Sequence, residues 1–148
     1  MQYDVVIIGS GPAGYVWAVR AAKYGLKTAI IEKEPTLGGT CLNWGCIPTK
    51  TLLKTAKVIH TIQEADHYGV SATGMTFDFA KIMARKDKVV ARIVKGVDFL
   101  MKSHKIDVIR GEASFVDAQT IATPHGKITT KNTLIATGSS PARPPIPG

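Results

Sequence analysis

Only four residues separate the two cysteines of this 148-residue chain, Cys41 and Cys46. On a regular helix, side chains five positions apart point about 140° apart, because each turn holds about 3.6 residues. A disulfide needs Cα atoms within about 4.4–6.8 Å, so the pair requires a distorted helix start, which Gly45 and Pro48 permit. A thiolate at a helix N-terminus has a lowered pKa and is nucleophilic, and Lys50 adds a positive charge nearby. The spacing therefore predicts a redox-active thiol pair at a bent helix start.

Three other arrangements of the two cysteines stay open at this point. They could be two buried free thiols, or they could form a structural disulfide, which is uncommon in cytosolic proteins. A zinc site needs further ligands, and the histidines show no ligand spacing. These histidines are His60, His67, His104 and His125. We therefore predict no metal site.

A second motif that suggests chemistry is Gly9-x-Gly11-x-x-Gly14. It follows an apolar run at residues 3–8, opens a helical pattern and precedes Glu32 at the end of the next predicted strand. Gly9 allows a tight turn, Gly11 lets the backbone approach a pyrophosphate, and Gly14 lets helix and strand pack closely. The helix N-terminus directs free N–H groups and a positive dipole at the phosphates. Glu32 would accept hydrogen bonds from ribose hydroxyls, and its negative charge would repel a 2′-phosphate. The motif therefore predicts NAD or FAD rather than NADP. The alternative is a glycine-rich turn without a ligand.

The elements that must position these motifs predict an α/β fold. Strand, helix and strand over residues 3–32, with the helix stopping at Gly25, indicate a parallel pair with a right-handed crossover. A helix is expected from Cys41 to about Ala65, and a long amphipathic helix from Phe77 to about Ser103, whose apolar stripe is Ile82, Val89, Val90, Ile93, Val97, Leu100 and Met101. Further strands are expected at residues 106–110, 112–116, 119–123, 127–130 and 132–137, followed by a proline-rich connector at 138–148. The predicted architecture is a parallel sheet with flanking helices and a small antiparallel β-meander.

Composition and charge narrow the function classes. The length suits one domain, and 45% hydrophobic residues are ordinary for a soluble globular protein. No apolar run reaches membrane-span length and the N-terminus lacks a basic region, so we expect no signal peptide and a cytoplasmic location. The net charge of +8 is spread without a basic run among aromatics, which favours a solvated surface over a nucleic-acid site. The 77–103 helix has a basic polar face, formed by Lys81, Arg85, Lys88, Arg92 and Lys95, which is the alternative sign of membrane attachment. We expect its apolar stripe to face the core and the protein to have no membrane partner.

Taken together, these motifs resemble the pyridine-nucleotide disulfide oxidoreductases with a C-x4-C centre. The resemblance covers the whole chain and rests on four segments: Gly9-Ser10-Gly11-Pro12-Ala13-Gly14, the strand end at Glu32, GGTCLNWGCIPTK at residues 38–50, and Ala136-Thr137-Gly138-Ser139. Within that family, Leu42, Ile47 and Thr49 make the thiol segment most similar to the dihydrolipoamide dehydrogenases. Glutathione and mercuric reductases more often have valines at the first two of these positions.

The resemblance implies a Rossmann-like FAD-binding domain over residues 1–148, with Cys41 and Cys46 as the catalytic residues. Cys46 would lie against the flavin, Cys41 would be the interchange thiol that attacks the substrate disulfide, and Lys50 would lie near the flavin N5. Residues 111–113 would lie near the adenosine and residues 137–139 near the pyrophosphate. The residues implied to bind FAD are Gly9, Gly11, Pro12, Ala13, Gly14, Glu32, Lys33, Gly38, Gly39, Thr40, Cys41, Lys50, Gly111, Ala113, Ala136, Thr137, Gly138 and Ser139.

The resemblance also implies a reaction, the oxidation of dihydrolipoamide to lipoamide with reduction of NAD+. Electrons would pass from the substrate dithiol to the Cys41–Cys46 disulfide, then to FAD and NAD+. The implied partners are the lipoyl domains of 2-oxo-acid dehydrogenase or glycine-cleavage complexes, and the intact protein would be a homodimer. Alternatives are another disulfide or mercuric reductase, or a non-catalytic FAD-binding module.

Chains of this family are considerably longer than the present one. Their remaining length holds an NAD domain, a return segment that completes the FAD domain, a dimerisation domain, and a His–Glu pair that acts as acid–base from the partner subunit. Because the reaction needs an acid–base group within reach of the interchange thiol, we expect this chain alone to lack turnover and to bind FAD poorly.

Overall fold

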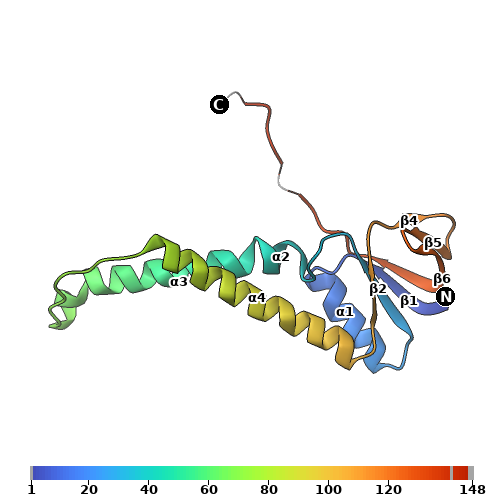
Figure 1. Ribbon diagram of the computed structural model, residues 1–148, viewed down its shortest axis with the longest axis horizontal. Coiled ribbons are helices and arrows are strands. Elements are labelled where there is room, and N and C mark those ends of the chain that lie inside the picture. The colour runs from blue at the N-terminus through green and yellow to red at the C-terminus, as the bar shows by residue number, and fades with distance from the viewer. Residues whose placement is uncertain (1, 141, 147–148) are drawn as a thin grey trace.

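A computed structural model describes residues 2–140 and 142–146 of the chain. It confirms the predicted α/β class, with one six-stranded sheet in the order β3-β2-β1-β6-β5-β4 and helices beside it (Figure 1). Three parallel pairings form its core. They join β1 (Gln2–Ile8) to β2 (Thr28–Glu32) and to β6 (Gly126–Ile135), and β2 to β3 (Asp107–Arg110). The predicted meander consists of β4 (Ser114–Phe115), β5 (Thr120–Thr123) and the start of β6, all antiparallel.

The last strand differs from its prediction. The sequence predicts two strands, at residues 127–130 and 132–137, but the structure has one, β6. Its first residues pair with β5, and from Thr129 onward it pairs in parallel with β1. The polar run T-T-K-N resembles a break between strands. The ladder to β1 and a hydrogen bond from the Thr130 hydroxyl to the Asn132 carbonyl (2.7 Å) keep it extended.

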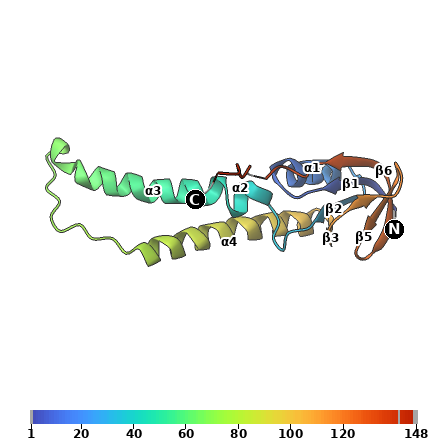
Figure 2. The same ribbon diagram turned by 90° about the horizontal axis from the view of Figure 1, so that it is seen from above.

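The helices divide into two groups. Helix α1 (Pro12–Lys23) turns Gly14, Ala18 and Ala21 inward. It begins at Pro12, which suits the first turn of a helix, and ends two residues before the predicted stop at Gly25. Helix α2 (Gly39–Asn43), α3 (Cys46–Gln63) and α4 (Phe79–Ser103) follow, with a short 3-10 helix, η1 (Ala65–Tyr68), after α3. Helices α3 and α4 run side by side as an arm that projects from the sheet (Figures 1 and 2).

The predicted apolar stripe of the long helix α4 packs against the hydrophobic core. Val97 and Met101 are buried with Ile7 and Ile30 of the sheet, and Val94, which the predicted stripe omitted, is buried with them. This packing supports the core interpretation of the helix over membrane attachment. Among the described residues, no helix is long and apolar enough to cross a membrane.

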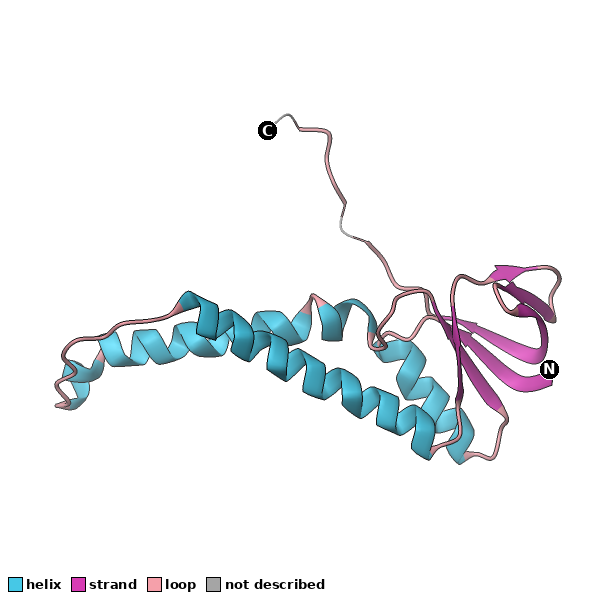
Figure 3. Cartoon of the chain, viewed as in Figure 1, coloured by secondary structure: helices cyan, strands magenta, loops and turns pink. Residues whose placement is uncertain are grey.

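The sheet and the arm occupy opposite ends of the molecule. Figure 3 shows the strands together at one end and the loop that closes the arm, residues 69–78, at the other. The described part of the predicted connector, residues 138–140 and 142–146, contains no helix or strand and extends away from the sheet. Residues 141, 147 and 148 of that connector lie outside the described residues.

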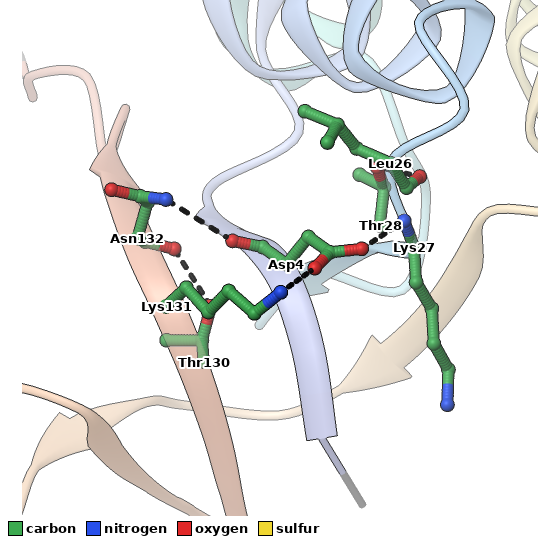
Figure 4. Close-up of polar contacts among 7 residues, drawn as sticks. All are labelled: Asp4, Leu26, Lys27, Thr28, Thr130, Lys131 and Asn132. Atoms are coloured by element: carbon green, nitrogen blue, oxygen red, sulfur yellow. Dashed lines mark hydrogen bonds and ion pairs between the residues drawn. The ribbon is translucent and has the colours of Figure 1, made fainter.

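A polar cluster joins the sheet strands at the ends opposite the glycine motif (Figure 4). The Asp4 carboxylate accepts hydrogen bonds from the Lys27 N–H (2.9 Å) and from Lys131 Nζ (2.7 Å). The Lys131 hydrogen bond is the main cause that holds the pKa of Asp4 below its ordinary value. Asp4 thus connects β1 to the residue that precedes β2 and to β6, and supports the register that aligns their carboxyl ends.

Candidate functional site

The two cysteines lie on either side of a break between helices. Cys41 belongs to α2, which ends at Asn43, and Cys46 is the first residue of α3. The N–H of Gly45 turns back to donate to the Thr40 carbonyl at 2.6 Å. A Cβ at position 45 would lie 2.9 Å from that oxygen, so the turn favours glycine. The predicted distortion is confirmed, but the single helix predicted from Cys41 to about Ala65 is wrong: it is two helices, the second ending at Gln63.

The break brings the two sulfur atoms together. Both residues are free thiols, with Cys41 half-buried and Cys46 exposed. The Cys41 thiol contacts the side chain and the backbone N–H of Cys46. The hydrogen bond to the Cys46 side chain and burial raise the pKa of Cys41, while the Cys46 N–H acts to lower it. The lowered thiol pKa predicted at a helix N-terminus therefore does not hold for Cys41, because the neighbouring sulfur outweighs the N–H.

The glycine motif forms a tight backbone crossing between β1 and α1. Gly9 has φ +100°, and a Cβ there would lie 2.3 Å from the Ala136 carbonyl oxygen. A Cβ on Gly14 would lie 1.8 Å from the Gly9 carbonyl oxygen. At Gly11, in contrast, an added Cβ meets nothing within 4 Å. Gly9 and Gly14 thus permit close packing, while Gly11 leaves open space in front of the N-terminus of α1.

Glu32 ends β2 as a buried carboxylate whose oxygens are held by hydrogen bonds. It is 6% exposed. Its Oε2 accepts from the Ser10 N–H (2.9 Å) and the Ser10 hydroxyl (2.5 Å), and its Oε1 accepts from the Glu34 N–H (2.9 Å). Burial acts to raise the pKa of Glu32, but these hydrogen bonds outweigh it, so the pKa lies below its ordinary value. The side chain stays ionised beside the glycine motif.

A cavity of about 440 Å³ joins the glycine motif, the acid and the thiols. It opens at the carboxyl ends of β1, β2 and β6, where the chain order reverses about β1, the usual position of ligands in such sheets. Its size is within the range of small-molecule pockets. The predicted site residues that line it are Gly9, Gly11, Pro12, Glu32, Lys33, Gly39, Thr40, Cys41, Cys46, Gly111, Ala136, Thr137, Gly138 and Ser139.

Five predicted site residues do not line this cavity. Gly14 and Gly38 support the backbone beneath it, and Lys50 is exposed on α3, one turn beyond Cys46. Ala13 lies in the first turn of α1, and Ala113 packs against the buried cluster on the meander side of the sheet. The cofactor contacts of all five stay predictions.

The cavity also has lining residues that the sequence did not single out. They are Ile8, Ser10, Ile31, Glu34, Trp44 and Ser140. Among them, Ser10 connects two parts of the site, because its hydroxyl donates a hydrogen bond to Glu32 and accepts one from the Gly38 N–H at 3.2 Å. Its position between two motif glycines was the available signal. Trp44, 54% exposed beside the thiols, follows no periodic pattern that would have marked it.

These residues fit an anionic dinucleotide with a redox group near the thiols. The open space at Gly11 faces the first turn of α1, where free N–H groups and the helix dipole favour phosphate. Glu32 retains lone pairs that can accept from hydroxyl groups, and the adjacent thiols can exchange with a disulfide.

Comparison with known proteins identifies relatives that are disulfide oxidoreductases. The family model described as "Pyridine nucleotide-disulphide oxidoreductase" matches residues 3–148. The chain is 49% identical to the dihydrolipoyl dehydrogenase of Acholeplasma laidlawii over 148 residues, which cover 99% of this chain and 44% of that protein. It is 45% identical to the dihydrolipoyl dehydrogenase of Bacillus subtilis, covering 95% of this chain and 32% of that protein.

Among solved structures, the HOCl-induced flavoprotein disulfide reductase RclA from Escherichia coli is similar, with a TM-score of 0.78 and 36% identity. The match covers 99% of this chain and 30% of that one. The chain therefore spans less than half the length of each of these relatives.

Proposed function

Because the chain belongs to the pyridine nucleotide-disulphide oxidoreductase family, which uses FAD and NAD(P), we propose that it forms the FAD-binding part of a dihydrolipoyl dehydrogenase. The observation that carries this proposal is that Gly11, Glu32 and both thiols line one and the same cavity. Similarity to dihydrolipoyl dehydrogenases over nearly the whole chain supports the choice of substrate.

In this proposal the cavity holds FAD along the carboxyl ends of the strands. The N–H groups behind Gly11 bind the pyrophosphate, with residues 137–139 on its other side. Glu32 accepts from the ribose hydroxyls, and Lys33 and Gly111 line the adenosine half. When bound, FAD supplies a two-electron acceptor beside the thiols.

The chain's own chemistry is thiol–disulfide exchange. A thiolate of the dihydrolipoyl group attacks the Cys41 sulfur of the Cys41–Cys46 disulfide and releases Cys46 as a thiolate. The second substrate thiolate then attacks the substrate sulfur of the mixed disulfide and releases Cys41. The products are the lipoyl disulfide and a reduced Cys41–Cys46 pair that holds both electrons. Released Cys46 lies at the first residue of α3, where the helix dipole stabilises negative charge.

We propose that proton transfer and NAD+ binding belong to the remaining length that the relatives have. None of the four histidines, all of them described, lines the cavity. The chain alone would then exchange thiols without turnover. Its proposed partners are lipoyl groups of 2-oxo-acid dehydrogenase or glycine-cleavage complexes, within a homodimer. The similarity to RclA favours a second candidate, a reductase of another disulfide.

FAD titration of the chain tests the cofactor site. We expect bound FAD to lose fluorescence, and Gly11→Ala to weaken binding at least about tenfold, since its methyl group would point into the cavity. Thermal unfolding of the apo variant should be unchanged, because nothing lies within 4 Å of that methyl group. Equal affinity in the two proteins would reject the pyrophosphate site.

Reduction of the oxidised pair tests the substrate. We expect dihydrolipoamide to reduce it faster than glutathione at equal thiol concentration, measured by mass spectrometry after alkylation. Cys41→Ser and Cys46→Ser should each abolish the two-thiol product. A faster reaction with glutathione would favour the second candidate function.

A further inference from the structure

The side chain of Asn43, the last residue of α2, makes three hydrogen bonds to the segment that leads into this helix. Its Nδ2 donates to the Leu37 carbonyl (3.0 Å) and to the Gly39 carbonyl (2.9 Å), and its Oδ1 accepts from the Thr36 hydroxyl (2.8 Å). Because carbonyl oxygens can only accept, the amide nitrogen must face them, and the hydroxyl fits the remaining oxygen. The side chain therefore bridges the end of α2 back to its start.

The segment at the start of α2 is itself fixed to the rest of the molecule. The Leu37 side chain is fully buried in the cluster that also holds Ile7 and Ile30 of the sheet. The Gly38 N–H donates to the carbonyl and hydroxyl oxygens of Ser10, at 3.0 and 3.2 Å. The side-chain amide at position 43 thus binds backbone that the core and the glycine loop hold in place.

Helix α2 has few other interactions that could fix its position. It contains five residues, whereas isolated helices shorter than about 12 residues are marginal in water. Its N-cap residue, Gly38, supplies no side-chain hydrogen bond, and Leu42 alone among its residues is buried. The hydrogen bonds of Asn43 are therefore a main restraint on this short helix.

Asn43 also lies inside the ring that a Cys41–Cys46 disulfide would close. It is the second of the four residues between the cysteines. Cys41 shares α2 with Asn43, whereas Cys46 begins α3, and the two thiols lie in contact across the break. A restraint on residues between two thiols narrows the range of separations that their sulfur atoms can adopt. The bridge thus keeps Cys41 where Cys46 can reach it.

We propose that Asn43 is a positioning residue of the thiol pair, whose two amide hydrogen bonds hold the Cys41 sulfur within bonding reach of the Cys46 sulfur. This rests on the proposed function, in which the pair carries two electrons, and adds to it the residue that sets how readily the disulfide closes. A displacement of about 1 Å can change the rate of a positioned reaction about 10²-fold. Without the bridge, the effective concentration of one thiol beside the other falls, and the disulfide becomes easier to reduce.

Equilibration of the full chain with reduced and oxidised glutathione measures this effective concentration. One thiolate of the reduced pair attacks glutathione disulfide and releases the first glutathione thiolate. The second protein thiolate then attacks the protein sulfur of the mixed disulfide and releases the other. Two electrons pass from the cysteines to glutathione, and the two protons of the cysteine thiols go to the released thiolates. Acid quenching, alkylation and mass spectrometry give the fractions of dithiol, mixed disulfide and protein disulfide.

The variant Asn43→Asp keeps the size of the side chain and the acceptor for Thr36 but removes both amide donors. Asn43→Ala removes them without adding a charge. We expect each to lower the equilibrium constant for disulfide formation about tenfold, which raises the two-electron reduction potential by about 30 mV. The mixed disulfide, which the neighbouring thiol resolves quickly in the wild type, should accumulate in both.

Thr36→Val removes only the hydroxyl that orients the amide. We expect it to shift the same equilibrium in the same direction by a smaller factor. Thr36 is exposed, so this variant should keep the fold and decides the question if the variants at position 43 do not fold. No shift in a folded Thr36→Val, with unfolded variants at position 43, would overturn the proposal.

Two controls separate positioning from stability. Asn132→Ala removes an amide that donates to the Asp4 carbonyl at 3.4 Å, at the opposite ends of the strands. Ala91→Gly destabilises α4 at an exposed position. Neither should change the equilibrium with glutathione, even where urea unfolding shows a loss of stability as large as that of Asn43→Ala.

The remaining outcomes distinguish the two proposals. A wild-type equilibrium constant in Asn43→Asp and Asn43→Ala would overturn the positioning role and leave the proposed function standing. An equal shift in Ala91→Gly would also overturn it, because the effect would then follow global stability. A wild-type chain whose thiols form only mixed disulfides with glutathione would overturn both proposals.

Discussion

Replacing Glu32 by glutamine should destabilise the chain by about 2 kcal/mol. The carboxylate is 6% exposed and accepts three hydrogen bonds, two at Oε2 from Ser10 and one at Oε1 from the Glu34 N–H. A glutamine has one oxygen. If that oxygen faces Ser10, its NH2 group faces the Glu34 N–H. A buried donor without an acceptor costs about 1–3 kcal/mol, and the remaining bonds lose their charge assistance.

Urea unfolding of four proteins measures this effect: the wild type, Glu32→Gln, Ser10→Ala and the double variant. Glu112→Gln, the same change at an exposed position, should stay within about 0.5 kcal/mol of the wild type. Because Ser10 supplies two of the three donors, the Glu32→Gln effect should be smaller in the Ser10→Ala background. Additive effects, or a Glu32→Gln effect no larger than that of Glu112→Gln, would refute the assigned role of the carboxylate.

The pH dependence of the stability difference between the wild type and Glu32→Gln tests the same carboxylate independently. The pKa of Glu32 lies below its ordinary value of 4.5 in the folded chain. A lowered folded pKa means that the contribution of the carboxylate is complete above the ordinary value and is lost as pH falls through the folded pKa. The difference between the wild type and Glu32→Gln should therefore shrink as pH is lowered from 7 towards 3. A difference that grows on acidification would contradict the hydrogen-bond assignment.

Three further predictions follow from single contacts. Gly14→Ala should destabilise the chain by at least about 3 kcal/mol in urea unfolding, because its Cβ would lie 1.8 Å from a backbone oxygen; a smaller loss would contradict the close crossing. Cys46→Ala removes the main cause that raises the pKa of Cys41, so the midpoint of Cys41 alkylation against pH should move down, and an unchanged midpoint would exclude that contact. Lys131→Ala should raise the pKa of Asp4 towards its ordinary value of 3.8, measured by NMR titration, and no shift would remove Lys131 as its main partner.

The local patterns predicted the positions of the glycine motif and of Glu32, while their contacts with a nucleotide stay predictions. An apolar run, three spaced glycines and an acid at the next strand end each act within a few residues. The structure places Gly9, Gly11 and Glu32 around one cavity and Gly14 at the close crossing with Gly9. Helical spacing also predicted the core face of α4, although Val94 was missed. These local patterns could not predict features that depend on residues far away in the sequence. Residues 126–135 stay one strand because β1 supplies the ladder, which no pattern within 127–137 reveals.

For the thiol segment, the sequence predicted the distortion between the two cysteines but not its form, and the redox activity of the pair stays a prediction. The spacing of Cys41 and Cys46 required a distortion, and Gly45 marked its position. The sequence still favoured one bent helix, since nothing local shows the N–H of Gly45 turning back to Thr40. The thiol pKa was misjudged for Cys41 for the same reason: an isolated helix terminus would lower it, but the other thiol lies in contact.

Ser10 explains how the two halves of the site keep a fixed relation. Its hydroxyl and N–H hold Glu32 at the end of β2, and its hydroxyl and carbonyl accept from the Gly38 N–H, at 3.2 and 3.0 Å, at the start of α2. A Cβ on Gly39 would lie 2.7 Å from the Gly11 Cα, so the start of the thiol helix packs directly on the glycine loop. Backbone contacts and one short side chain, rather than long flexible ones, thus set the position of Cys41 relative to the proposed phosphate site. Exchange chemistry needs sulfur and acceptor aligned closely, and this connection gives the serine within the glycine motif a positioning role.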